Sequence, residues 1–194
     1  MNALSIEPVK LVAAVLYQNS EDFELAKQLM SDAFSRIDYE GDAFPFVESD
    51  YYEAEMGAKL KRLMISFDSL VMPDQLVKAK QTTQQLEKLL ANQGNRTANM
   101  DIGYLDIFKL ILASYKGRGN KIYMGEQIWA DMILYFEKGD YQPFVWSFPD
   151  FKSGIYNKDL KVIRNIYKNQ LKEYRVKLKN YPEYSQNSGK LKTT

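Results

Sequence analysis

The stretch from Val9 to Tyr17, VKLVAAVLY, is the feature that most constrains what this chain can fold into. It is a continuous apolar run rich in β-branched residues. Such a run is typical of a buried strand in the centre of a sheet. Its apolar part is too short to cross a bilayer, so we expect a central strand and no membrane span.

The segments that follow alternate between helix and strand patterns. Capping residues and apolar residues at helical spacing predict helices, and β-branched runs predict strands. In chain order, the pattern predicts a helix over 19–34, strands over 36–46 and 60–70, a helix over 72–94 and a strand over 96–105. This βαββαβ order is that of a ferredoxin-like α+β fold. The direct passage from the second strand to the third argues against a doubly wound sheet.

The second half of the chain adds two features to this core. Residues 106–115 fit either a short helix or a strand, and residues 121–146 read as a β-meander. A long C-terminal helix is predicted over 157–179. We therefore expect a single α+β domain over residues 1–180, followed by a polar, disordered tail over 181–194.

The chain contains no cysteine and no histidine. Disulfide scaffolds, cysteine-based metal sites and thiol nucleophiles are therefore excluded, as are catalytic triads built on imidazole. Any catalysis would have to use Asp, Glu, Lys, Tyr, Arg, Ser or backbone groups. No basic segment precedes the first apolar run, so a signal peptide is not expected and we predict a cytoplasmic protein.

Charge is distributed unevenly along the chain. Residues 1–151 hold 15 Lys/Arg and 22 Asp/Glu, whereas residues 152–194 hold 11 and 3. The acidic excess is greatest over 21–55, and the basic excess lies on one stripe of the last helix, over 158–179. These surfaces could attract each other within the molecule, or the basic one could bind an acidic partner such as RNA.

The segment Phe44–Gly57, FPFVESDYYEAEMG, holds four carboxylates in fourteen residues. A solvated loop between two strands, an Mg²⁺ or acid–base site, and a docking surface for a basic partner all fit it. Its acids do not match a calcium-binding loop. Together with an acid further along the chain they form a candidate acidic site, for which Mg²⁺ is the candidate cofactor: Asp50, Glu53, Glu55 and Asp101.

The segment KGRGNK is a candidate phosphate-binding loop. Glycines free backbone N–H groups to point inward, and the side chains of Lys116, Arg118 and Lys121 supply positive charge. A basic, glycine-containing turn that leads into a strand has the same composition.

Aromatic residues suggest a third type of site. The segment Phe144–Tyr156 is rich in aromatics and precedes the basic helix, where it could stack nucleic-acid bases or pack the helix onto the sheet. The candidate aromatic cluster consists of Tyr51, Tyr52, Tyr104 and Trp146. The chain lacks the phosphate loop of nucleotide-binding P-loop proteins and the dinucleotide-binding glycine motif.

Five short motifs occur in order along the chain: FPF, DYYEAEMG followed by LKR, MDIGYL, KIYMG and WSFPDFKS. Together they resemble the domain-of-unknown-function 4416 family, small bacterial and archaeal proteins of about this length. The resemblance extends from Val9 to the last helix. Some members carry a GTP-binding label, which no motif of this sequence supports.

The resemblance singles out a set of family-type positions and one departure. Relatives often have His-Arg where this chain has Asn120-Lys121, and asparagine cannot titrate near neutral pH. An enzyme is therefore the less favoured interpretation. The family-type positions are Asp50, Tyr51, Tyr52, Glu55, Gly57, Asp101, Gly103, Tyr104, Lys116, Tyr123, Trp146, Pro149 and Asp150.

Three functions remain open at this point. The favoured one is a binding or adaptor module that uses the acidic surface over 21–55 and the basic surface over 158–179. The first alternative is a protein or Mg²⁺-dependent enzyme that binds a phosphate-containing ligand, such as a nucleotide, through the acidic site and the Lys/Arg-Gly loop. The second alternative is RNA binding through the C-terminal helix.

Overall fold

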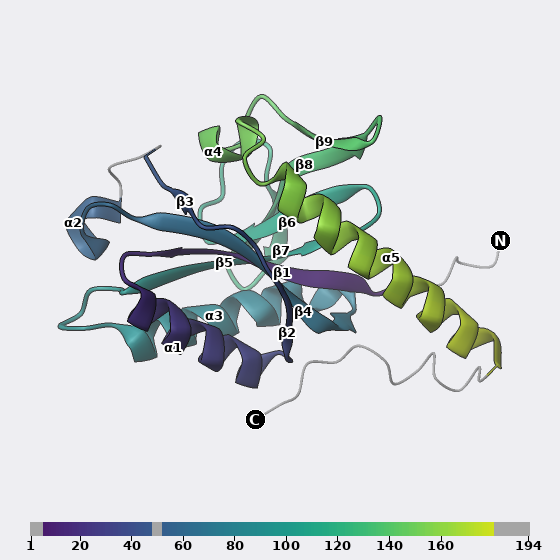
Figure 1. The fold of residues 1–194 in the computed structure, drawn as a ribbon, viewed down its shortest axis with the longest axis horizontal. Helices are drawn as coiled ribbons and strands as arrows, with labels where there is room; N and C mark the ends of the chain where they lie inside the picture. The colour runs from purple at the N-terminus through teal and green to yellow at the C-terminus, as the bar shows by residue number, and fades with distance from the viewer. Residues whose placement is uncertain (1–5, 48–51, 181–194) are drawn as a thin grey trace.

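A computed structural model describes residues 6–47 and 52–180, which form three layers (Figure 1). The middle layer is a nine-stranded antiparallel sheet, with α1 and α3 on one face and α5 on the other. This arrangement confirms the α+β class. The elements are β1 (Val9–Tyr17), α1 (Ser20–Ala33), β2 (Ile37–Glu40), β3 (Phe44–Pro45), α2 (Glu53–Met56), β4 (Lys61–Val71), α3 (Leu76–Leu90), β5 (Ala98–Leu105), β6 (Lys109–Ser114), β7 (Ile122–Gly125), β8 (Ile128–Glu137), β9 (Asp140–Pro143), α4 (Pro149–Lys152) and α5 (Asn157–Asn180).

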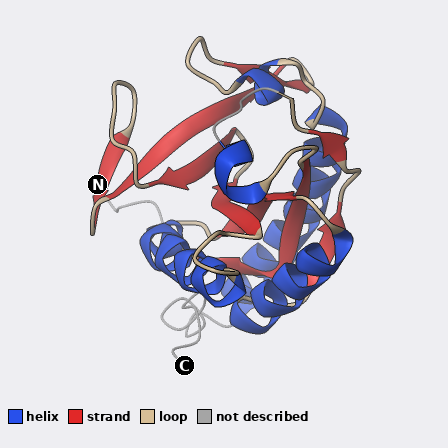
Figure 2. Ribbon diagram, turned by 90° about the vertical axis from the view of Figure 1, so that its left-hand side faces the viewer, coloured by secondary structure: helices blue, strands red, loops and turns tan. Residues whose placement is uncertain are grey.

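The strands follow the order β2-β4-β1-β5-β6-β8-β7, with β3 also paired to β4 and β9 to β8. As predicted, β1 is central: it pairs with β4 on one side and with β5 on the other, antiparallel to both. Figure 2 shows that the sheet is strongly twisted, as large sheets of L-amino acids generally are.

The apolar residues of β1 explain why both faces of the sheet must be covered. Alternate side chains of a strand point to opposite faces. Leu11, Ala13 and Val15 pack on the side of α1 and α3, whereas Val12 and Ala14 pack on the side of α5. The first core draws on both of the earlier helices, and the second on the buried stripe of α5.

The long C-terminal helix is confirmed, and the meander of β7, β8 and β9 lies where it was predicted. The ambiguous segment 106–115 contains strand β6. Two expected elements differ in extent. The strand over 36–46 is broken into β2 and β3, and α3 ends at Leu90, shortly before an isolated β-bridge between Asn92 and Asn95. Residues 181–194 lie outside the described residues.

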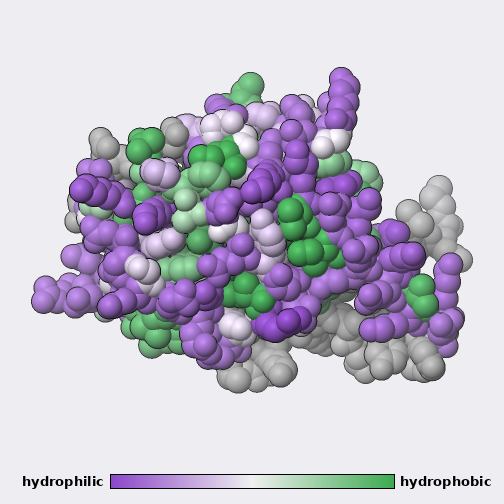
Figure 3. Space-filling model, in the orientation of Figure 1, coloured by the Kyte–Doolittle hydropathy of each residue, from purple (hydrophilic) through white to green (hydrophobic). Residues whose placement is uncertain are grey.

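A buried polar network joins α5 to the sheet. The side chain of Lys10 is fully buried, forms an ion pair with Asp38 and donates a hydrogen bond to Gln170 of α5 at 2.8 Å. Ser66 donates to the other oxygen of Asp38 at 2.6 Å. The side of the molecule on which α1 and α5 are both visible is largely hydrophilic, with apolar residues in separate groups (Figure 3). None of the helices in the described ranges is long and apolar enough to span a membrane.

The sheet opens between β5 and β6. Over its whole length β5 pairs with β1, but it pairs with β6 only from Gly103 to Leu105. At Gly103 the strands come so close that a Cβ would collide with the carbonyl oxygen of Ile111. Beyond this point, towards Ala98 on β5 and Ser114 on β6, no pairing joins the two strands.

Candidate functional site

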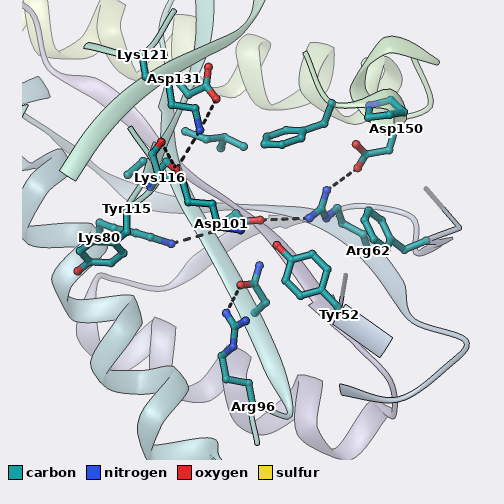
Figure 4. Close-up of a pocket in the computed structure, with 17 residues that line it drawn as sticks. Tyr52, Arg62, Lys80, Arg96, Asp101, Tyr115, Lys116, Lys121, Asp131 and Asp150 are labelled. Atoms are coloured by element: carbon teal, nitrogen blue, oxygen red, sulfur yellow. Dashed lines mark hydrogen bonds and ion pairs between the residues drawn. The ribbon is translucent and has the colours of Figure 1, made fainter. Parts of the chain in front are cut away.

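A cavity of about 380 Å³ lies at this opening (Figure 4). Its volume falls within the range of about 300–1,000 Å³ that is usual for small-molecule sites. The wall is formed by β4, β5, β6 and β8, by α3, and by the segments around Tyr52 and Phe148. Because the strands diverge here, side chains of α3 reach the cavity from the opposite face of the sheet.

Charged side chains gather around the cavity from many parts of the sequence. Five of the lining residues are cations and three are acids, so positive charge is in excess. The cations are Arg62, Lys80, Arg96, Lys116 and Lys121, and the acids are Asp101, Asp131 and Asp150.

Arg62 connects two of these acids. Its guanidinium donates to Asp150 at 2.6 Å and to Asp101 at 3.2 Å, and Tyr156 also donates to Asp150, at 3.1 Å. Arg62 and Asp150 are each only 4% exposed. Burial alone would lower the pKa of Arg62, but Asp101 and Asp150 raise it above its ordinary value. The guanidinium is therefore a fixed positive charge in the wall.

Asp131 is the anchor on the meander side. Its carboxylate accepts a hydrogen bond from the amide of Asn120 at 2.9 Å and forms an ion pair with Lys121 at 3.1 Å. Lys121 also donates to the hydroxyl of Ser114 at 3.1 Å. This acid thereby fixes the end of the basic loop beside the cavity.

Arg96 connects the cavity to α2 and α3. It donates to both oxygens of Glu55, at 2.8 and 2.7 Å, and to Asn99 at 2.7 Å. Glu87 of α3 lies 3.5 Å from Arg96 and accepts the backbone N–H of Met100 at 2.6 Å. Burial raises the pKa of Glu87, and the hydrogen bonds from Arg96 lower the pKa of Glu55.

Lys80 has the least complete set of partners among the buried cations. Its side chain is about nine-tenths buried and points into the cavity from α3 (Figure 4). The nearest carboxylate oxygen, on Asp101, is 3.8 Å from its ammonium nitrogen, which is beyond hydrogen-bond distance. Within the described ranges, this ammonium donates no hydrogen bond.

The predicted acidic site is only partly gathered at the cavity. Asp101 lines the cavity. Glu55 does not line it but accepts hydrogen bonds from Arg96, and Glu53 is exposed on α2. Asp50 lies outside the described residues. In the parts of the chain that the structure describes, no group of three or more acidic residues is placed to hold a metal ion.

The predicted phosphate-binding loop and the predicted aromatic cluster are also only partly at the cavity. Lys116 and Lys121 line the cavity, whereas Arg118 is exposed away from it. Of the aromatic cluster, Tyr52 lines the cavity, and Tyr51 lies outside the described residues. Tyr104 packs against the core on the side of α1 and α3, and Trp146 stacks on Phe144 and donates to the carbonyl oxygen of Met132 at 3.0 Å.

Several residues of the site were not predicted. Arg62, Arg96 and Asn99 lie in or beside strands and were not among the candidate site residues, although Arg62 lies in the LKR motif and Asn99 stands two positions before Asp101. Lys80 and Glu87 did carry a signal, because they are seven positions apart and lie beside the apolar stripe of the same helix. Charged residues at such positions are more often buried than the rest of a helix surface.

Comparison with known proteins is consistent with the motif resemblance. The model of a family described as a domain of unknown function, DUF4416, matches residues 7–167. The chain belongs to the DUF4416 family. No curated protein and no solved structure matches it.

The two charged surfaces of this DUF4416 protein are partly paired within the molecule. On the basic surface, Lys158 forms an ion pair with Asp42 at 3.2 Å and Lys161 with Asp140 at 3.3 Å. Arg175 donates to Glu7 at 2.8 Å. On the acidic surface, Lys27 lies 3.0 Å from Glu40. Recognition of an adaptor partner or of RNA through these surfaces stays a prediction.

The Glu55–Arg96 pair predicts a specific pH dependence. Because the pKa of Glu55 is lowered from 4.5, its contribution to stability is complete above pH 4.5 and is lost as the pH falls through the lowered value. Glu55→Gln should therefore lower the thermal unfolding midpoint most near pH 7, and the difference from wild type should vanish in strong acid. Glu53→Gln, an exposed change on the same helix, is the control. A difference that is the same at every pH would contradict the prediction.

Proposed function

We propose that this DUF4416 protein binds a small molecule that carries a phosphate group, with the phosphate held at the lysine side of the cavity. The observation that carries the proposal is Lys80. Its side chain is largely buried, but its ammonium has no carboxylate within hydrogen-bond distance, so its three donors are available to a ligand in the cavity. An anionic ligand at this point would supply acceptors for them.

The neighbouring lysines support phosphate as the anion. Lys80, Lys116 and Lys121 come from α3 and from the basic loop, and they lie on one side of the cavity in Figure 4. A phosphate group carries up to two negative charges and three acceptor oxygens near neutral pH. Lysine serves as a point charge in many phosphate sites. Several lysines that converge from different elements suit such an ion better than a single carboxylate.

The proposal also includes the finer topology. We propose that β1, α1, β2, β4, α3 and β5 form a ferredoxin-like unit, supported by the strand order β2-β4-β1-β5 and by two helices on one face. The meander from β6 onward is then an addition to its β5 edge. The cavity lies at the junction of the unit and this addition, a usual place for ligand sites.

The test is thermal unfolding and calorimetric titration with inorganic phosphate and ribose 5-phosphate. A ligand at a hundred times its dissociation constant stabilises by about 2.7 kcal/mol, which for a chain of this size raises the unfolding midpoint by roughly 5–10 °C. Lys80→Met should weaken ribose 5-phosphate binding by more than about tenfold, because hydrogen bonds to charged groups contribute about 1.5–3 kcal/mol.

Lys88→Met is the matched control, since Lys88 is exposed near the end of the same helix. It should leave the affinity unchanged. The proposal fails if no phosphate compound raises the midpoint, or if the Lys80 and Lys88 variants bind with equal affinity.

A further inference from the structure

The side of the cavity opposite the lysines has a different chemical character. In Figure 4, Tyr52, Arg62 and Asp150 lie on this side, with Asp101 between them and the lysines. Phe46 and Phe148 also line the cavity. The rings of Phe46 and Tyr52 are in an edge-to-face arrangement at 6.1 Å, and the guanidinium of Arg62 lies 4.5 Å from the centre of the Phe46 ring. Flat aromatic and guanidinium surfaces therefore form this part of the wall.

The same wall contains buried polar atoms that lack a partner. Among the described residues, the side-chain N–H₂ of Asn99, the Nε of Arg62 and one carboxylate oxygen of Asp150 have none. All three residues are only 3–4% exposed. Unpaired buried polar atoms are uncommon in folded proteins, and each needs a physical explanation. The nitrogen atoms of Asn99 and Arg62 are hydrogen-bond donors, and the oxygen of Asp150 is an acceptor, so this wall contains both kinds of group.

The strand register explains why these atoms share one wall. Arg62 of β4 and Asn99 of β5 both pair with Leu16 of β1, so they lie in one row across the sheet. Asn99 and Asp101, two positions apart on β5, point to the same face. Asp150 reaches this row from α4 through its hydrogen bond with Arg62.

We infer, building on the proposed function, that the ligand is a nucleoside phosphate whose base occupies this aromatic side of the cavity. Bases present a flat π-face that stacks on aromatic and guanidinium groups. Their edges carry donors and acceptors side by side, which match Asn99 and Asp150. A sugar phosphate would satisfy the lysines but would leave both the ring surfaces and the unpaired polar atoms unused.

Calorimetric titration with a matched set of ligands tests this inference. The set consists of the four common nucleoside 5′-monophosphates, the corresponding nucleosides, ribose 5-phosphate, and pyridoxal 5′-phosphate as a ring phosphate that is not a nucleotide. At least one nucleoside monophosphate should bind tenfold or more tightly than ribose 5-phosphate, and more tightly than pyridoxal 5′-phosphate.

Two variants separate the base from the phosphate. Phe148→Ala and Tyr52→Leu should weaken binding of the nucleoside monophosphate fivefold or more and leave ribose 5-phosphate unaffected, whereas Lys80→Met should weaken both. Phe148 is 45% exposed, so its truncation should leave the fold intact even if the Tyr52 variant unfolds. Phe108→Ala, at a residue 69% exposed and outside the cavity, is the control.

The outcomes distinguish this inference from the proposed function. Equal affinity for ribose 5-phosphate and every nucleoside monophosphate overturns the base site and leaves the phosphate site standing. Tighter binding of pyridoxal 5′-phosphate overturns the assignment to nucleotides. Binding of nucleosides as tight as that of their phosphates overturns the phosphate site instead. If no phosphate compound binds, both are overturned.

Discussion

Replacing Arg62 by methionine should lower the free energy of unfolding by about 3–5 kcal/mol, the usual cost of removing one partner from a buried ion pair. The guanidinium of Arg62 is the cation closest to Asp150, at 2.6 Å, and it also donates to Asp101. Without it, the carboxylate of Asp150 would be left in a wall where its side chain is 6% exposed, with only the hydroxyl of Tyr156 as a donor. Urea denaturation measures this loss. The dependence of the unfolding free energy on urea concentration should be the same in the variant and the wild type.

The comparison is Arg36→Met. Arg36 also forms an ion pair, with Asp68 at 3.2 Å, but its side chain is 76% exposed. Exposed pairs of this kind contribute about 0–1 kcal/mol. If the two variants lost similar free energy of unfolding, the buried ion pairs of Arg62 would stabilise the fold no more than an exposed pair does.

Replacing Asp38 by leucine should also lower the free energy of unfolding by about 3–5 kcal/mol. Here the affected ion pair belongs to the network that joins α5 to the sheet. The substitution would leave the ammonium of Lys10, which is fully buried, with only the side chain of Gln170 as an acceptor. Burial already lowers the pKa of Lys10 while Asp38 is present. The loss of stability should therefore shrink as the pH is raised towards 10, because the neutral amine tolerates burial better than the ammonium.

A second variant separates loss of charge pairing from loss of packing. Lys10→Met combined with Asp38→Leu removes both charges and retains side chains of similar volume. It should recover most of the stability lost in the single Asp38 variant, because an apolar pair does not need charge compensation. A double variant that is less stable than the single one would mean that the ion pair itself stabilises the contact between α5 and the sheet.

Local sequence patterns were sufficient to predict most of the framework. The apolar run of β1 predicted the central strand, and the stepwise apolar residues of α5 predicted its position to within one residue at the C-terminal end. The interruption between β2 and β3 was not predicted. There, a Cβ at Gly41 would lie 2.6 Å from a carboxylate oxygen of Asp159 in α5. A contact between residues this far apart in the chain leaves no local signal.

The candidate site was predicted only in fragments. Asp101, Lys116, Lys121 and Tyr52 came from three separate motifs, and no pattern indicated that they share one cavity. Their proximity depends on the divergence of β5 from β6, which follows from where strand pairing stops. The partners of Arg62 are also distant in sequence, 39 and 88 positions away. Single-sequence reasoning cannot identify pairs of this kind.

Because β5 and β6 diverge, the cavity is formed by the course of the backbone and does not depend on the identity of any one side chain. Exchanging a lining residue would change the chemistry of the wall but would not abolish the cavity. A chain built on this plan can therefore acquire a new specificity through single substitutions, while the two cores that hold it folded stay as they are. Stability and the proposed recognition would in this sense depend largely on separate sets of residues, although Arg62, Leu112 and Ala113 belong to both.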